Sequence, residues 1–325
     1  MTEQDGLICA YRLDGEGGGE RYPTLESIPE RSGAHLSWIH LNRSAPQAQQ
    51  WLRRESGLPP LICDALLAEE TRPRCAAIED GILLNLRGVN LNPESDPEDM
   101  VSIRVWLQTD RIISCRTRQL MAVSDLLQSI ESGQGPRETG GFVITIAERL
   151  TARMDPVIDA LEDKLDELED TSIQAPTREL RSELAEVRRE TIMLRRYIAP
   201  QRDALRHLAM LEGPSLSPSQ RDRLNEIADT VTRYIEDLDV IRDRATVMND
   251  EVANRIAERM DKTMLILSLV TLIFLPLTVI SGLLGMNVGG IPGGDSPWAF
   301  AIVCLLFVAI GAFQVWLFRR LKWWL

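Results

Sequence analysis

The sequence predicts an α+β membrane protein, with an N-terminal cytosolic α/β domain, a long helical stalk and two C-terminal transmembrane helices. Three observations support this fold class. Up to about residue 135, short β-branched and aromatic runs alternate with turn residues, which is typical of strands. From about residue 141 the apolar residues follow a helical period. Two stretches without charge, 263–294 and 296–318, exceed the roughly 20 helical residues that cross a bilayer.

Residues 1–135 are expected to form the cytosolic α/β domain. Five runs predict strands: LICAYRL, HLSWIHLN, ILLNLRGVN, VSIRVWLQ and RIISCRT. Three segments predict helices: SAPQAQQWLRRES, PPLICDALLAEE and RQLMAVSDLLQSIESG. Ser44 is a candidate N-cap of the first helix, and Gly133 is expected to end the third.

Residues 136–262 are expected to form a helical stalk region. The first predicted helix, 142–174, is amphipathic and kinked at Pro156, and the second, 177–211, is interrupted or bent near Pro200. Both expectations rest on proline, which lacks a backbone N–H and disturbs the preceding helical turn.

The third predicted helix is the most informative part of the stalk. Pro276 is the only proline from Ser219 to Asn287, so we expect a continuous helix of roughly 100 Å at about 1.5 Å per residue. One helix cannot bury an apolar seam alone, so its seam suggests neighbouring helices and a homo-oligomeric stalk. The seam recurs at steps of three or four residues: Leu224, Ala228, Val231, Ile235, Leu238, Ile241, Ala245, Met248, Val252 and Ile256.

The uncharged stretches predict transmembrane helices at 263–287 and 298–318, joined by a periplasmic loop at 288–297 and followed by a cytosolic basic tail at 319–325. Basic residues gather on the cytoplasmic side of membrane proteins, so both termini are expected in the cytoplasm and membrane lipid around the spans. The N-terminus has no basic region followed by an apolar run, so no cleavable signal peptide is expected. The loop carries only Asp295, whereas the flanking cations are Arg255, Arg259, Lys262, Arg319, Arg320 and Lys322.

Charge and motif content exclude several functions. The net charge of −12 argues against nucleic acid as a partner. We find no nucleophile elbow, phosphate loop or metalloprotease motif, so we expect no enzyme and no cofactor besides a transported ion. The five cysteines form no Cys-x-x-Cys pair and no close cluster with His35, His40 or His207. We therefore expect structural roles for them, and the sequence identifies no metal ligands.

The stretch FLPLTVISGLLGMNVGGIPGG, residues 274–294, resembles the end of the first span in the CorA superfamily of divalent-cation channels and transporters. The hallmark of that family is Gly-Met-Asn, here Gly285, Met286 and Asn287. Its position after Pro-Leu-Thr, at the outer end of the first of two C-terminal spans, makes the match specific. LRRYIAPQRDAL, WIHLN and RPRCAAIEDGILLNLRGVN extend the resemblance over essentially the whole chain.

The resemblance implies a homopentameric funnel in the cell inner membrane. The α/β domain would form its rim, the first span would line the pore and the second would form an outer ring. The loop VGGIPGG is similar to the ZntB branch of zinc transporters, so zinc is the expected ion. Met286 is the form common in the magnesium branch, so a magnesium, cobalt or nickel channel is the alternative. A membrane-anchored coiled-coil sensor or scaffold is an alternative of another class, which would not need a polar mouth.

In this resemblance, Asn287 of each subunit contributes to a ring of carboxamides at the outer mouth. A divalent cation such as Mg²⁺ holds its water shell tightly, and a neutral amide oxygen can hydrogen-bond that shell without removing it. A ring of carboxylates would bind more tightly, whereas conduction needs a site that the ion can leave. The alternative role of Asn287 is a helix C-cap.

Counting back from Asn287 at helical steps predicts a pore-lining face. It carries Thr278, Leu275, Thr271, Ser268 or Leu267, and Met264. Hydroxyl rings can solvate a passing ion, and apolar rings can gate by dewetting; contact with lipid or a neighbouring helix is the alternative. Further towards the cytosol, possible acidic rings, or exposed surface residues, are Asp261, Asp250 and Glu251.

Overall fold

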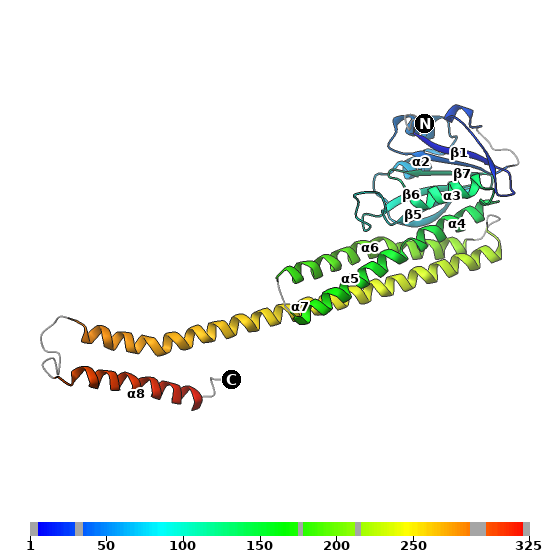
Figure 1. Ribbon diagram of the computed structural model, residues 1–325. Coiled ribbons are helices and arrows are strands. Elements are labelled where there is room, and N and C mark those ends of the chain that lie inside the picture. The colour runs from blue at the N-terminus through cyan, green and yellow to red at the C-terminus, as the bar shows by residue number, and fades with distance from the viewer. Residues whose placement is uncertain (1–5, 30–34, 175–177, 212–215, 287–296, 321–325) are drawn as a thin grey trace. The chain divides into compact units, whose positions relative to one another are not determined.

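The computed structural model describes residues 6–29, 35–174, 178–211, 216–286 and 297–320 (Figure 1). The chain forms two compact units, Met1–Asp250 and Glu251–Leu325. The first unit holds the α/β domain and most of the helical stalk. The second holds two candidate membrane spans.

A seven-stranded sheet organises the first unit. Its strands are β1 (Leu7–Leu13), β2 (Gly19–Arg21), β3 (Ser37–Asn42), β4 (Arg74–Ile78), β5 (Gly81–Gly88), β6 (Val101–Leu107) and β7 (Arg111–Arg116). They lie in the order β2-β1-β3-β7-β6-β5-β4, and only the β3–β7 pair is parallel. The five predicted strands are confirmed. β2 and β4 escaped prediction because GER and RCAAI are short and poor in β-branched residues.

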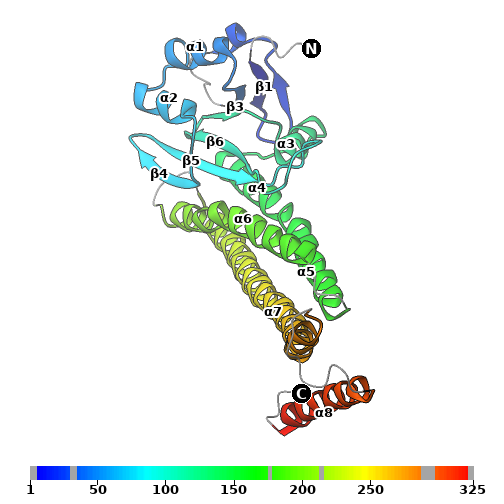
Figure 2. The ribbon, with the colours of Figure 1, turned by 90° about the vertical axis from the view of Figure 1, so that its left-hand side faces the viewer.

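Helices α1 (Pro46–Arg54) and α2 (Pro60–Leu67) cover one face of the sheet (Figure 2). Trp51, Leu52, Ile62 and Leu66 are buried there against alternate residues of the strands. These strand residues are Ile39, Leu41, Leu83, Trp106, Ile113 and Cys115.

The N-cap predicted for α1 is wrong. Ala45 occupies the cap position and no side chain caps the helix. Pro46 begins α1, where its missing N–H costs nothing because first-turn amides have no intrahelical acceptor. Ser44 belongs to the preceding turn, where its backbone N–H donates to Asn42 Oδ1 at 3.0 Å.

Helices α4 (Thr139–Ala152) and α6 (Arg178–Met210) pack on the other face of the sheet. Phe142 of α4 meets Trp38 of β3 edge to face, with ring centroids 5.2 Å apart. Gln201 of α6 accepts the backbone N–H of Arg87 at 2.7 Å. Helix α3 (Met121–Glu131) packs on α4, and Gly133 follows it with a φ of 73°, as expected for a residue that ends a helix.

The structure differs from expectation at Pro156, whereas at Pro200 it excludes the expected interruption and leaves the expected bend a prediction. The predicted helix 142–174 is two helices, since α4 ends at Ala152 and α5 runs over Asp155–Gln174. Pro156 therefore lies in the first turn of α5, where a missing donor is harmless. Pro200, in contrast, lies inside α6, which continues through it to Met210.

The apolar seam is buried within the single chain. Helix α7 runs over Pro218–Leu284, and its seam residues from Leu224 to Met248 are buried. Arg244 of α7 binds Asp166 and Glu169 of α5 at 2.7 and 2.6 Å. The predicted neighbouring helices are thus present, but they belong to the same chain. The seam therefore gives no support for an oligomer, contrary to our expectation.

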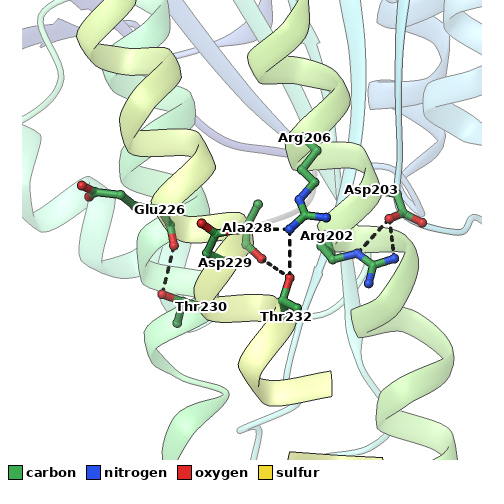
Figure 3. Close-up of polar contacts among 8 residues, drawn as sticks. All are labelled: Arg202, Asp203, Arg206, Glu226, Ala228, Asp229, Thr230 and Thr232. Atoms are coloured by element: carbon green, nitrogen blue, oxygen red, sulfur yellow. Dashed lines mark hydrogen bonds and ion pairs between the residues drawn. The ribbon is translucent and has the colours of Figure 1, made fainter. Parts of the chain in front are cut away.

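Polar contacts flank this seam on the α6 side. Figure 3 shows Arg206 of α6 reaching Asp229 and Thr232 of α7, at 3.1 and 3.4 Å. Arg202, one turn earlier, binds Asp203 of its own helix. Exposed ion pairs of this kind contribute little free energy, so the buried seam holds α7 in place and the polar contacts border it.

The second unit contains the remainder of α7 and helix α8 (Ala299–Arg320). Both are long and apolar enough to cross a membrane, with a mean hydropathy of 2.5 over their most apolar 18 residues. None of those residues is buried in the single chain. Such uncovered apolar helices are expected where lipid or further protein surrounds them.

Candidate ion pathway along helix α7

Five predicted pore-lining residues share one face of α7, which we call the stripe: Met264, Ser268, Thr271, Leu275 and Thr278. Their steps of four, three, four and three residues keep them within an arc of about 80° on an α-helix. All five side chains are exposed in the single chain. The stripe is therefore a mixed polar and apolar face, inside a candidate span, that its own chain does not cover.

The threonines of the stripe point their hydroxyl protons at the backbone. Thr271 Oγ1 donates to Leu267 O at 2.9 Å, and Thr278 Oγ1 donates to Phe274 O at 2.8 Å. Each hydroxyl oxygen keeps lone pairs as an acceptor. The water shell of a cation directs its hydrogens outward, so acceptors on this face match a hydrated cation.

The acidic candidates separate into two kinds. Asp261 precedes Met264 by three residues and extends the stripe, and Asp250 precedes Asp261 by eleven, which is about three helical turns. Both are exposed. Glu251 lies one residue on from Asp250 and forms an ion pair with Arg255. The structure therefore gives Glu251 a local partner off the stripe.

The C-terminal end of the first candidate span is described as far as Met286. Helix α7 ends at Leu284. Gly285 N–H donates to Ser281 O at 2.9 Å and Met286 N–H to Leu283 O at 3.4 Å, which closes the last turn. Asn287 and residues 288–296 of the predicted loop lie outside the described residues. The helical count from Asn287 thus passes the end of α7, and Met264–Thr278 alone define the stripe.

The side of α7 opposite the stripe is partly covered. The half-buried residues of this stretch are Leu269, Ile273, Pro276, Leu277 and Ile280. Gln314 of α8 donates its side-chain N–H to the backbone oxygen of Leu272 at 3.1 Å. The sequence analysis missed Gln314, although an amide within an apolar span was a visible signal.

The structure offers no alternative metal centre in the described ranges: no three His, Cys, Asp or Glu residues lie close enough there to hold an ion. His40 is buried and its Nδ1 lies 2.8 Å from Ser114 Oγ. Burial, reinforced by Arg116, lowers the pKa of His40 to about 3. Burial raises the pKa of the Cys9 and Cys115 thiols to about 12. These groups are neutral and enclosed, which agrees with the structural roles expected for them.

The α/β domain, the long α7 and the two C-terminal apolar helices define a class of membrane protein with two candidate spans per chain. The family described as "CorA-like Mg2+ transporter protein" matches residues 33–320. The chain belongs to this CorA family.

Relatives and solved structures agree over nearly the whole chain. The Divalent cation transporter CmaX of Pseudomonas aeruginosa is 43% identical over 329 residues, covering 99% of this chain and 98% of the relative. The Zinc transport protein ZntB of Pectobacterium carotovorum is 36% identical over 324 residues, covering 99% and 97%. The structure of full-length CmaX matches with a TM-score of 0.85 at 42% identity, covering 99% of each chain.

A more distant structure shares the fold. The CorA magnesium transporter of Methanocaldococcus jannaschii matches with a TM-score of 0.81 at 22% identity, covering 98% of this chain and 99% of that one. The predicted superfamily is therefore confirmed, together with its α/β domain, long helix and two C-terminal apolar helices.

Proposed function

We propose that this protein transports divalent cations, zinc foremost, across the cell inner membrane through a pore that several copies line with the stripe of α7. The observation that carries the proposal is the stripe itself. It places three hydroxyl-bearing side chains on an exposed face of a candidate span, while the residues opposite the stripe are half-buried and Gln314 of α8 contacts the backbone of the span at Leu272. Polar side chains that face lipid cost free energy. Their presence on this face therefore favours a water-filled path beside it.

Several copies are needed because two helices cannot enclose a pore. The family resemblance supports a homopentamer, with α8 outside the ring of α7 helices and both termini in the cytoplasm. Asp261 and Asp250 would then form acidic rings that concentrate cations on the cytosolic side. Glu251 would have a lesser role, since Arg255 neutralises it.

Asn287, with Gly285 and Met286, would form the outer mouth. A ring of neutral carboxamides can select a hydrated cation and still release it. Ser268, Thr271 and Thr278 would accept hydrogen bonds from the water shell within the span. Met264 and Leu275 would form apolar rings that interrupt the water column when the pore is narrow.

Zinc is favoured by the ZntB relatives and by the similarity of VGGIPGG to that branch. The described residues contain no cluster of histidine and cysteine ligands, so the ion would pass with water rather than bound to soft ligands. Magnesium, cobalt or nickel is the alternative that Met286 supports. A sensor or scaffold remains the alternative of another class, and it requires no flux.

The test is metal entry into liposomes that contain the purified protein, with zinc- and magnesium-sensitive dyes inside. Asn287→Ala and Thr278→Ala should each lower zinc entry at least tenfold. Thr263→Ala is the matched control, because Thr263 Oγ1 also donates to a carbonyl four residues earlier, Arg259 O, at 2.9 Å, yet lies about 100° around the helix from Met264. Its flux should stay near the wild-type rate.

Three outcomes would count against parts of this proposal. Unchanged entry with Asn287→Ala would remove the carboxamide ring. Magnesium entry with little zinc would move the chain to the magnesium alternative. A folded oligomer that admits neither ion would favour the sensor or scaffold.

A further inference from the structure

Pro276 leaves a backbone acceptor without its helical donor in the middle of a candidate span. Proline has no N–H, so the carbonyl four residues earlier, Leu272 O, loses its intrahelical bond, and the ring pushes that carbonyl outward. In hydrocarbon no water can replace the missing donor, and an unsatisfied carbonyl is costly. A span that keeps this proline therefore needs a donor from elsewhere.

Gln314 of α8 provides that donor. Its side-chain Nε2 donates to Leu272 O at 3.1 Å, across 42 residues of sequence. Gln314 is the only carboxamide in the α8 sequence AFAIVCLLFVAIGAFQVWLFRR. The one amide of the second span therefore meets the one carbonyl of the first span that proline deprives of its donor.

The carbonyl oxygen of the Gln314 side chain makes no comparable contact among the described residues. Gln314 Oε1 is buried and has no hydrogen-bond partner in the part of the chain that the structure describes. A carboxamide is expensive in an apolar helix, so a side chain kept for packing alone would be better replaced by an apolar one. The donor is the group that this position uses.

The position of Pro276 in α7 links the contact between Gln314 and Leu272 O to the stripe. Pro276 follows Leu275 directly and precedes Thr278 by two residues, so any bend of α7 at Pro276 moves Thr278 relative to Met264, Ser268 and Thr271. A helix without the full backbone ladder bends most easily at such a point. The helix that contacts Leu272 O can therefore set how far α7 bends.

We propose that Gln314 is a positioning residue for transport. Its side chain replaces the donor that Pro276 removes, holds α8 against α7 at this proline and so fixes the bend that places Thr278. This inference rests on the proposed function and adds to it a named contact between the two spans. Gln314 contacts no ion in this account and acts through the backbone of α7.

A double-mutant cycle in the full-length protein tests the contact. Gln314→Met keeps the length of the side chain without its donor, and Pro276→Ala returns the missing N–H to the helix. The midpoint of thermal unfolding is measured in lipid nanodiscs for the wild type, both single variants and the double variant. We expect Gln314→Met to lower the midpoint by several degrees in the wild type and by less than one degree in the Pro276→Ala background.

Equal losses in the two backgrounds would overturn the contact, because the amide would then stabilise the protein independently of the proline. No loss in either background would overturn it as well. Both outcomes are measured by thermal unfolding and do not depend on transport.

Zinc entry into liposomes tests the positioning role. Gln314→Met should lower the maximal rate at least threefold and leave the half-saturating zinc concentration unchanged, because no stripe residue is altered. In the Pro276→Ala background the same substitution should change neither. A shift in the half-saturating concentration with an unchanged maximal rate would overturn the positioning role.

Absence of zinc entry in the wild type would contradict the proposed function, while the thermal cycle would still decide whether the contact exists.

Discussion

At the scale of single residues, the chemistry of the proposed pathway within the span is carried by uncharged groups. Thr271 and Thr278 turn their protons to the backbone and leave oxygen acceptors on the stripe. Acceptors of this kind interact with the water of a hydrated cation and do not hold the ion itself. In the proposed pathway these residues would therefore favour passage of the ion over its retention.

The stripe was predictable from the sequence, whereas the contact between Gln314 and Leu272 O was not. Met264, Ser268, Thr271, Leu275 and Thr278 follow a simple helical spacing that a sequence displays. The pairing of Gln314 with Leu272 O depends on which faces of two helices meet, and no spacing within one helix contains that information. Asn287 was recognised only through its family motif, because a lone asparagine after a span is equally suited to a helix end.

The lowered pKa of His40 predicts how the stability of the protein changes in acid. Its pKa is about 3 in the folded protein, lowered from 6.5 by burial and then by Arg116. Between these values the unfolded chain binds a proton that the folded chain does not, so this contribution to stability falls as the pH drops below 6.5. Acidification from pH 7 to pH 5 should cost the wild type about 2 kcal/mol through this residue.

The measurement is the free energy of unfolding of the full-length protein across that pH range. His40→Asn retains a polar group near Ser114 and removes the titration, so its stability should fall less steeply on acidification. Parallel slopes for the two proteins would contradict the assignment of a depressed pKa to His40.

At the scale of elements, sequence reasoning failed at Pro156, at the interruption expected near Pro200 and at the two short strands. A proline predicts a disturbed turn, but only the packing decides whether the chain breaks there, as before α5, or continues, as through Pro200. β2 and β4 are held by hydrogen bonds to β1 and β5 rather than by their own composition. The longer apolar strands and helices were predictable because burial of an entire face dictates their pattern.

The two faces of α7 in the first unit should respond differently to the same substitution. Val231 is 0% exposed on the seam and Val240 is 55% exposed on the far face. Val231→Ala should lower the free energy of unfolding by about 2 kcal/mol, because two buried methyl groups are lost. Val240→Ala should leave the stability of the single chain unchanged.

Denaturant titration of the two variants at several protein concentrations distinguishes these effects. Any loss with Val240→Ala should depend on concentration, which would mark the far face as a contact between copies. A concentration-independent loss equal to that of Val231→Ala would show that the far face packs within the chain, contrary to the structure.

At the scale of the whole molecule, the proposed topology places both termini in the cytoplasm and the loop between the spans outside. The cations that flank the spans, together with the single charge of the loop, support this orientation. A cysteine in place of Asp295 should therefore react with a membrane-impermeant maleimide in intact spheroplasts. A cysteine in place of Arg319 should react only after the membrane is opened.

The native thiols provide the background for that labelling. Cys9, Cys63 and Cys115 are buried and should stay unlabelled in the folded protein, whereas Cys75 is half-buried and Cys304 is exposed, so both are replaced by alanine in the labelled variants. Labelling of position 319 from outside, with position 295 protected, would reverse the proposed orientation.

The enclosure of Cys9 and Cys115 has a consequence for the proposed transport of zinc, a metal that binds thiolates. Free thiolates are strong zinc ligands, but Cys9 and Cys115 are held as protonated thiols in the core, with a pKa of about 12. Zinc in excess then meets no competing thiolate from these residues. Under the proposed function, Cys9 and Cys115 would therefore not retain the transported zinc.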